Sequence, residues 1–305
     1  MSVMSLLHCG TKGRLTFGEM PNSSSIELID ESALMQKVAL ITGGGSGFGK
    51  GLARELVIAG WTVYAADKNA KAAKATAELG AIPLTMDVTS DASVQAGVKK
   101  IIREQKRIDL LVANAGFGNF SSIEETSPEA VREIFEVNVF GVERCVREVL
   151  PHMRKQRSGR IIMTTSVVAH VSLVGLGWYS ATKHAVKAVA NALRQEVKHL
   201  GISVSTVEPG TSKTGFGSVA FGLLDQGRSL SEYDGVMRGL NKWLGGLYRI
   251  SPGPSNTVFK MYQAATAHNP KAHYPVSWDV RVLKLIFYVV PRRWLDRFVL
   301  WLAKR

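Results

Sequence analysis

The sequence predicts an α/β fold in which one doubly wound parallel sheet of about seven strands carries helices on both faces. From Lys37 onward, short apolar runs alternate with longer amphipathic runs, which is typical of successive βαβ units. The short runs are too apolar for one face of each strand to lie in water, as expected inside a parallel sheet. With 305 residues, of which 46% are hydrophobic, the chain can bury the core of such a sheet as a single domain.

The two kinds of run give the order of the predicted elements. The strands are Val38–Thr42, Thr62–Ala66, Ile82–Met86, Leu110–Ala113, Arg160–Thr165, Ser203–Val207 and a short one around Ala272–Val276. The helices are Gly47–Ala59, Ala70–Leu79, Ala92–Lys106, Pro128–Met153 and Trp178–Leu200. Gly60, Gly80 and Gly201 are expected to close helices, because glycine readily adopts the left-handed conformation of a C-cap. Asp91 and Ser127 stand where two N-caps are expected.

Three segments lie outside this alternation. Residues 1–34 lack the basic start and apolar run of a secretory signal, so we predict a flexible N-terminal extension. Residues 211–250 are glycine-rich with scattered large apolar residues, which indicates either a lid over a substrate or an ordinary helical pair on the sheet edge. Residues 281–305 are basic and amphipathic, and Pro291 divides them into two predicted helices. The main domain is therefore predicted to span residues 35–280.

The net charge of +13 is concentrated near the C-terminus, where residues 281–305 contain seven basic residues and one acidic residue. Because aromatic and leucine residues are interleaved with these charges, one hypothesis places Val282–Arg305 on an anionic membrane surface. The alternative is a helix that docks a partner subunit or covers the substrate pocket. No apolar run reaches about 18 residues, so no transmembrane helix is predicted. No basic recognition helix indicates a nucleic-acid partner.

Cys9 and Cys145 are the only cysteines in the chain. They are too few for a disulfide framework and lack the spacing of metal ligands. We therefore expect no metal site and a cytoplasmic location, peripheral to a membrane if the C-terminal helices bind one.

A glycine-rich loop connects the first predicted strand to the first helix. At such a turn the backbone can approach a pyrophosphate closely, and the helix N-terminus supplies free N–H groups and partial positive charge. A glycine-rich surface turn is the alternative interpretation. The residues predicted to bind dinucleotide phosphates are Gly43, Gly45, Ser46, Gly47, Phe48 and Gly49.

The second strand is followed by an acidic residue that bears on the choice of cofactor. Asp67 lies about 20 residues past the glycines, where a carboxylate can accept hydrogen bonds from the adenosine ribose. A 2′-phosphate would meet this carboxylate, so NAD is favoured. Lys68 could instead neutralise such a phosphate, so NADP is not excluded.

Three residues suggest proton chemistry at the carboxyl edge of the sheet. Tyr179 and Lys183 are four residues apart on a predicted helix and share one face, and Ser166 follows the fifth strand. Ketone reduction needs a proton on oxygen as hydride reaches carbon, and a nearby ammonium favours the phenolate of tyrosine. Ser166 can hold the substrate oxygen beside Tyr179. The set predicts an NAD(P)-dependent oxidoreductase that interconverts an alcohol and a ketone or aldehyde.

Together these residues resemble the pattern of a classical short-chain dehydrogenase/reductase, over about Lys37 to Phe216. The resemblance implies a Rossmann-type catalytic domain at residues 35–280 and a homodimer or homotetramer formed through two of the helices. It also implies that Asn138 holds a water that links Lys183 to solvent. The cofactor contacts that it implies are Asp87, Val88, Asn114, Ala115, Gly116, Tyr179, Lys183, Pro209, Gly210, Thr211 and Thr214.

The same resemblance indicates which residues line the substrate pocket. They are Ser166, Phe117, His170, Trp178, Tyr179 and Phe216. Their neighbourhoods are apolar or aromatic, so we expect a lipophilic alcohol or ketone that is steroid-like, retinoid-like or long-chain. A broad-specificity carbonyl reductase is the alternative. Two features depart from the family pattern. Glu208 precedes Pro209 where an asparagine or a small residue is common, and Val167–His170 follows Ser166 in place of a small, glycine-ending run. The alternative to a substrate contact by His170 is a partly exposed structural histidine.

A different class of function also stays open. The same fold could sense dinucleotide redox state as a non-catalytic regulator or scaffold. A degenerate catalytic set would favour that interpretation, whereas the set in this sequence is intact.

Overall fold

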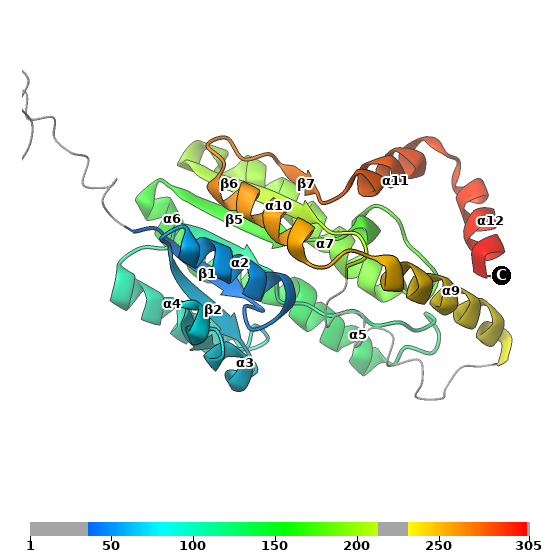
Figure 1. Ribbon diagram of the computed structural model, residues 1–305, viewed down its shortest axis with the longest axis horizontal. Helices are drawn as coiled ribbons and strands as arrows, with labels where there is room; N and C mark the ends of the chain where they lie inside the picture. Colours follow the sequence, from blue (N-terminus) through cyan, green and yellow to red (C-terminus); the bar gives the residue numbers. More distant parts are fainter. Residues whose placement is uncertain (1–35, 213–230, 304–305) are drawn as a thin grey trace, which may run out of the picture. The chain divides into compact units, whose positions relative to one another are not determined.

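The computed structural model describes residues 36–212 and 231–303. Seven strands form one sheet in the order β3-β2-β1-β4-β5-β6-β7, and every neighbouring pair is parallel (Figure 1). The chain adds β2 and β3 on one side of β1 and β4 to β7 on the other, which confirms the predicted doubly wound sheet. The strands are β1 (Val38–Thr42), β2 (Thr62–Asp67), β3 (Ile82–Thr85), β4 (Leu110–Ala113), β5 (Gly159–Thr164), β6 (Ile202–Glu208) and β7 (His273–Pro275).

Helices cover both faces of this sheet, as predicted. In chain order the helices of the described ranges are α2 (Gly47–Ile58), α3 (Ala70–Lys74), α4 (Asp91–Gln105), α5 (Pro128–Phe135), α6 (Gly141–Gln156), α7 (Gly177–Val197), α9 (Ser231–Ile250), α10 (Ser255–Thr266), α11 (Trp278–Val289) and α12 (Arg292–Ala303).

The alternation of side chains along β1 explains why one sheet carries two cores. Val38 and Leu40 point into an apolar cluster that also contains buried side chains of α4, α6 and α7. Ala39 and Ile41 point into a second cluster, formed with α2 and α10. Because all five residues of β1 are buried, the strand reads as a continuous apolar run in the sequence.

Two local predictions were wrong. The predicted helix Ala70–Leu79 is α3 followed by a separate 3₁₀ turn, Ala77–Leu79. The predicted helix Pro128–Met153 is present as one helical run, within which Glu136–Phe140 forms a π-helical turn. The N-cap of α4 is Ser90, whose hydroxyl accepts a hydrogen bond from the Ser93 N–H. Asp91 is the first helical residue instead, and its carboxylate pairs with Arg144 and Arg147 on α6.

The segment that suggested a lid contains one long helix, α9, within residues 231–250. Its buried side chains Met237, Leu240 and Leu244 belong to an apolar cluster that also contains Tyr179 and Phe120. The helix therefore packs beside the predicted catalytic tyrosine. The rest of the lid prediction, residues 213–230, lies outside the described residues, as do residues 1–34.

Two further helices, α11 and α12, lie on either side of Pro291 and reach the C-terminal end of the described chain (Figure 1). Within the described residues, no helix combines the length and apolar character that crossing a membrane requires.

The sheet places the predicted site residues at one edge. Because β1, β4, β5 and β6 are parallel neighbours, their carboxyl ends lie side by side. The glycine loop, Asn114, Ser166 and Pro209 follow these four strands directly.

Candidate active site

The loop after β1 has the backbone of a phosphate cradle. Gly43 adopts a left-handed conformation with φ of 62°, and a Cβ there would lie 3.0 Å from the Cα of Ala115. At Gly49 a Cβ would overlap the carbonyl oxygen of Gly43. Ser46 precedes α2, and its side chain does not cap the helix. The first N–H groups of α2 thus keep their donors for a ligand, and the loop fits a dinucleotide pyrophosphate.

Asn114 fastens the glycine loop to the end of β4. Its Nδ2 donates to the main-chain oxygen of Thr42 at 3.1 Å, and its Oδ1 accepts from the Thr164 hydroxyl at 3.2 Å. The Thr42 hydroxyl in turn accepts from the main-chain N–H groups of Asn114 and Ala115, both at 3.0 Å. These bonds join the ends of β1, β4 and β5 into one rigid edge.

The two carboxylates predicted to contact an adenosine lie at the carboxyl ends of β2 and β3. Asp67 Oδ2 accepts from the Gly45 N–H at 3.2 Å, so it lies against the glycine loop. Asp87 accepts from the N–H and the hydroxyl of Thr89, and these hydrogen bonds hold the pKa of Asp87 below its ordinary value. The positive charges of Lys68 and Arg144 lower the same pKa further.

Asn138 is buried in the π-helical turn between α5 and α6. Its Nδ2 donates to the Phe117 carbonyl at 2.9 Å and to the Thr182 hydroxyl at 3.1 Å. A Cβ added at Gly116 would lie 2.8 Å from Asn138 Oδ1 and 3.5 Å from Lys183 Nζ. Asn138 and Lys183 therefore flank Gly116, as a proton relay through Asn138 would require.

The three residues predicted to carry the chemistry meet at the end of β5. The Ser166 hydroxyl donates to the Pro209 carbonyl at 3.4 Å and forms a side-chain hydrogen bond with Tyr179. Lys183 Nζ lies 5.7 Å from the centre of the Tyr179 ring and donates to the Thr164 carbonyl at 3.1 Å. Tyr179 and Lys183 are one turn apart on α7, as predicted, and both are buried.

Burial dominates the titration of this pair. It raises the pKa of Tyr179 above its ordinary value, while the hydrogen bond to Ser166 acts in the opposite direction. Burial also lowers the pKa of Lys183 to about 8. Desolvation disfavours the charged form of both groups. That the ammonium makes the phenol more acidic stays a prediction.

His170 approaches protein groups with both ring nitrogens, although Nε2 forms no hydrogen bond within the described residues. Nδ1 lies 2.8 Å from Lys187 Nζ, and Nε2 lies 3.3 Å from Oε1 of the fully buried Glu208. The same carboxylate oxygen lies 3.4 Å from Nδ1 of His273 on β7. This arrangement favours the structural interpretation of His170. Its substrate contact stays a prediction.

The remaining predicted residues divide into two groups. Phe117 and Trp178 pack against the apolar cluster that contains Tyr179 and α9, and Trp178 Nε1 is buried without a hydrogen-bond partner among the described residues. Thr211 lies after β6 and bonds to the Ser251 hydroxyl at 2.6 Å. Thr214 and Phe216 lie outside the described residues.

Several residues that support the site were not predicted from the sequence. Thr164 binds both Asn114 and Lys183, Thr182 binds Asn138, and His273 approaches Glu208. Thr182 could have been found, because it lies three residues after Tyr179 on the same helix. His273 could not, since only the pairing of β6 with β7 brings it near Glu208.

Comparison with known proteins identifies the family. A family model described as short chain dehydrogenase matches residues 37–220. The chain belongs to the short-chain dehydrogenase/reductase family. It is accordingly an oxidoreductase, and the Rossmann-type sheet is the family fold.

Two relatives and one solved structure illustrate what this short-chain dehydrogenase/reductase is similar to. The 3-ketodihydrosphingosine reductase of Bacteroides thetaiotaomicron is 39% identical over 60% of this chain and 66% of the relative. The 17-beta-hydroxysteroid dehydrogenase type 6 of Rattus norvegicus is 31% identical over 87% of this chain and 88% of the relative. The crystal structure of a short-chain dehydrogenase/reductase from Burkholderia phymatum in complex with NAD superposes with a TM-score of 0.72, at 25% identity, over 83% of this chain and 92% of that one.

Proposed function

We propose that this protein interconverts a lipophilic alcohol and the corresponding ketone or aldehyde, with Tyr179 as general acid and base. The observation that carries the proposal is the convergence of Ser166, Tyr179 and Lys183 at the end of β5, beside the glycine loop. A bound nicotinamide dinucleotide supplies or accepts the hydride.

Each residue of the set has a separate task in the reduction direction. Ser166 donates a hydrogen bond to the substrate oxygen and holds it near Tyr179. Tyr179 gives its phenolic proton to that oxygen as hydride reaches the carbon, and it takes the proton back in the oxidation direction. Lys183 and Asn138 return a proton to Tyr179 from solvent. The buried phenol with a raised pKa is well suited to remain protonated until substrate arrives.

NAD is the proposed cofactor. Asp67 lies against Gly45 at the glycine loop, where its carboxylate would accept hydrogen bonds from a ribose and repel a 2′-phosphate. The relative from Burkholderia phymatum was crystallised with NAD. Lys68 keeps NADP as the alternative, and Asp67→Asn tests the choice: NADH affinity falls and NADPH affinity rises if Asp67 selects the cofactor.

We propose a lipophilic substrate because the side chains around Tyr179 are apolar. Phe117, Trp178, Leu176 and the inner face of α9 share one apolar cluster with it. The names of two relatives refer to a steroid and to a sphingoid ketone. A broad-specificity carbonyl reductase remains the alternative, and it predicts similar kcat/KM for small and long-chain ketones.

We propose a homodimer or homotetramer formed through α5, α6 and α7, which light scattering tests directly. We also propose a cytoplasmic location, because two cysteines are too few for a disulfide framework. We further propose peripheral contact with a membrane through residues 282–305.

The decisive experiment combines binding and turnover. Fluorescence titration with NADH and NADPH measures cofactor affinity, and a screen over lipophilic ketones and alcohols measures turnover. Tyr179→Phe should bind the cofactor but lose turnover, while Tyr64→Phe, a buried tyrosine of the sheet core, should keep it. Full turnover by Tyr179→Phe would disprove the mechanism. Cofactor binding without turnover on any substrate would favour the regulator or scaffold.

A further inference from the structure

The outer face of α11 is apolar and exposed to solvent. Val282, Ile286 and Val289 follow one another at helical spacing, with exposed fractions of 42%, 39% and 67%. Leu285 and Tyr288 lie beside them and are 63% and 90% exposed. A surface helix of a soluble protein would normally place polar residues at such positions.

α12 has two distinct faces. Leu295 is 8% exposed on the side where the helix packs against α9. Trp294 and Phe298, four residues apart, are 67% and 56% exposed, and the Phe298 ring stacks on Trp301 with the ring centres 5.9 Å apart. The packed face thus has its partner in α9, while a second face presents aromatic rings to the outside.

The apolar surface continues onto α9. A groove of about 500 Å³ runs between α9 and α12, and its apolar lining includes Trp243, Leu247, Ile250 and Trp301. Ile250 is 81% exposed. A groove of this volume and apolar lining can take a single hydrocarbon chain from the outside.

Basic side chains accompany these apolar ones. From the start of α11 to the end of α12, residues 278–303 contain five basic residues and two acidic residues, Asp279 and Asp296. Arg281, Arg292, Arg293 and Arg297 are all exposed. The combination of exposed rings, aliphatic side chains and arginines on short helices matches an interfacial helix pair better than a protein interface, where charged residues are depleted at the core.

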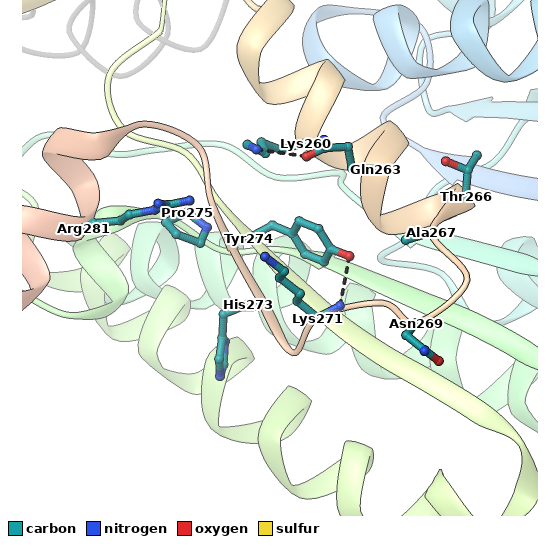
Figure 2. A pocket seen from close by; sticks show the side chains of 10 residues that line it. All are labelled: Lys260, Gln263, Thr266, Ala267, Asn269, Lys271, His273, Tyr274, Pro275 and Arg281. Carbon is teal, nitrogen blue, oxygen red and sulfur yellow. Dashed lines mark hydrogen bonds between the residues drawn. The ribbon is translucent and has the colours of Figure 1, made fainter.

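A basic pocket lies at the start of α11. It has a volume of about 280 Å³ and includes Lys260, Lys271 and Arg281 in its lining, with no acidic residue among the residues that line it (Figure 2). Lys260 donates to Gln263 Oε1 at 2.9 Å, and His273, which also lines the pocket, lies 3.4 Å from the buried Glu208 carboxylate. Arg281 is one helical turn from Leu285, so the pocket borders the apolar face of α11 and can take a lipid phosphate.

We propose that the exposed faces of α11 and α12, named here the α11–α12 surface, dock this protein onto an anionic phospholipid bilayer. The apolar side chains enter the acyl boundary, the arginines contact anionic headgroups, and the basic pocket holds one lipid phosphate. Neither helix is long enough to cross the bilayer, so both lie along its surface. A lipophilic substrate would then reach Tyr179 from the side of α9.

Sedimentation of the full-length protein with vesicles tests this docking without any activity measurement. The protein should bind vesicles that contain phosphatidylglycerol and phosphatidylcholine, and bind pure phosphatidylcholine vesicles far less. Replacing Arg292, Arg293 and Arg297 with Gln should weaken binding to the anionic vesicles about 100-fold, because each basic side chain near an anionic surface contributes several-fold. The double variant Trp294→Ser/Phe298→Ser should weaken binding to a similar degree.

Matched variants elsewhere on the surface serve as controls. Replacing Arg54, Lys74 and Lys99 with Gln changes the net charge equally, and Ile58→Ser removes a side chain that is 69% exposed on α2. Both controls should bind vesicles like the unmodified protein. Equal losses in the control and test variants would overturn the proposal, as would equal binding to both kinds of vesicle. Lipid-free self-association that Trp294→Ser/Phe298→Ser abolishes would assign the surface to a second copy of the chain instead.

Discussion

The side-chain amide of Asn138 holds the main chain of Phe117 at two points. Its Oδ1 accepts from the Phe117 N–H at 3.0 Å, and its Nδ2 donates to the Phe117 carbonyl at 2.9 Å. This pair fixes the loop after β4 against the π-helical turn, so the shape of the site beside Lys183 depends on one buried amide.

Replacing Asn138 with Ala should therefore affect both stability and catalysis. The loss leaves buried main-chain groups of Phe117 unsatisfied, and we expect about 3 kcal/mol less free energy of unfolding in urea. Turnover should fall even where the variant is fully folded. Ser127→Ala removes an exposed N-cap that accepts from Ala130 at 3.2 Å and should cost only about 1 kcal/mol, with turnover unchanged. Equal effects of the two substitutions would contradict the role of Asn138.

The buried Lys183 predicts how stability depends on pH. Its pKa is about 8 in the folded protein and 10.5 ordinarily, so below pH 8 both states are charged and the burial penalty is constant. Between these values the unfolded chain binds the extra proton, and stability must rise with pH. We expect Lys183→Met to exceed the unmodified protein in stability by an amount that shrinks by about 3 kcal/mol across this window. Urea unfolding of both proteins measures the difference, and a constant difference would refute the prediction.

A methyl group at Gly49 should weaken cofactor binding, whereas a methyl group at Gly245 should leave it unchanged. In Gly49→Ala the new Cβ overlaps the Gly43 carbonyl, so the glycine loop must move. We expect NADH affinity, measured by fluorescence titration, to fall more than tenfold, since the loop no longer fits a pyrophosphate. In α9 nothing lies within 4 Å of a Cβ at Gly245. Gly245→Ala should leave NADH affinity intact and add about 0.5 to 1 kcal/mol of stability.

Substitutions of His170 distinguish a structural role of this residue from a contact with substrate. His170→Ala leaves the buried Glu208 carboxylate with fewer partners, and we expect about 3 kcal/mol of lost stability. His170→Gln keeps an N–H for that carboxylate and should recover part of the loss. If the structural role is correct, KM for the best substrate found stays within about twofold in the Gln variant. A large rise in KM without a change in stability would establish the substrate contact instead.

The sequence was a reliable guide where one physical rule dominated. Buried parallel strands such as Val38–Thr42 have to be apolar throughout, and Gly43 needs a left-handed backbone, so both were recognisable from residue type alone. Capping was predicted less well. Ser90 and Asp91 are both good N-caps, and in the structure Ser90 caps the helix while the Asp91 carboxylate pairs with two arginines of α6.

The amino-acid sequence by itself determined the order of strands and helices, the glycine loop and the identities of Ser166, Tyr179 and Lys183, because these depend on local periodicity and spacing. Only the tertiary structure decided that α9 packs beside Tyr179, that His170 and His273 meet Glu208, and that burial governs the pKa values of Tyr179 and Lys183. These features depend on contacts between segments far apart in the chain and on the exclusion of water, and neither is encoded in the spacing of residues.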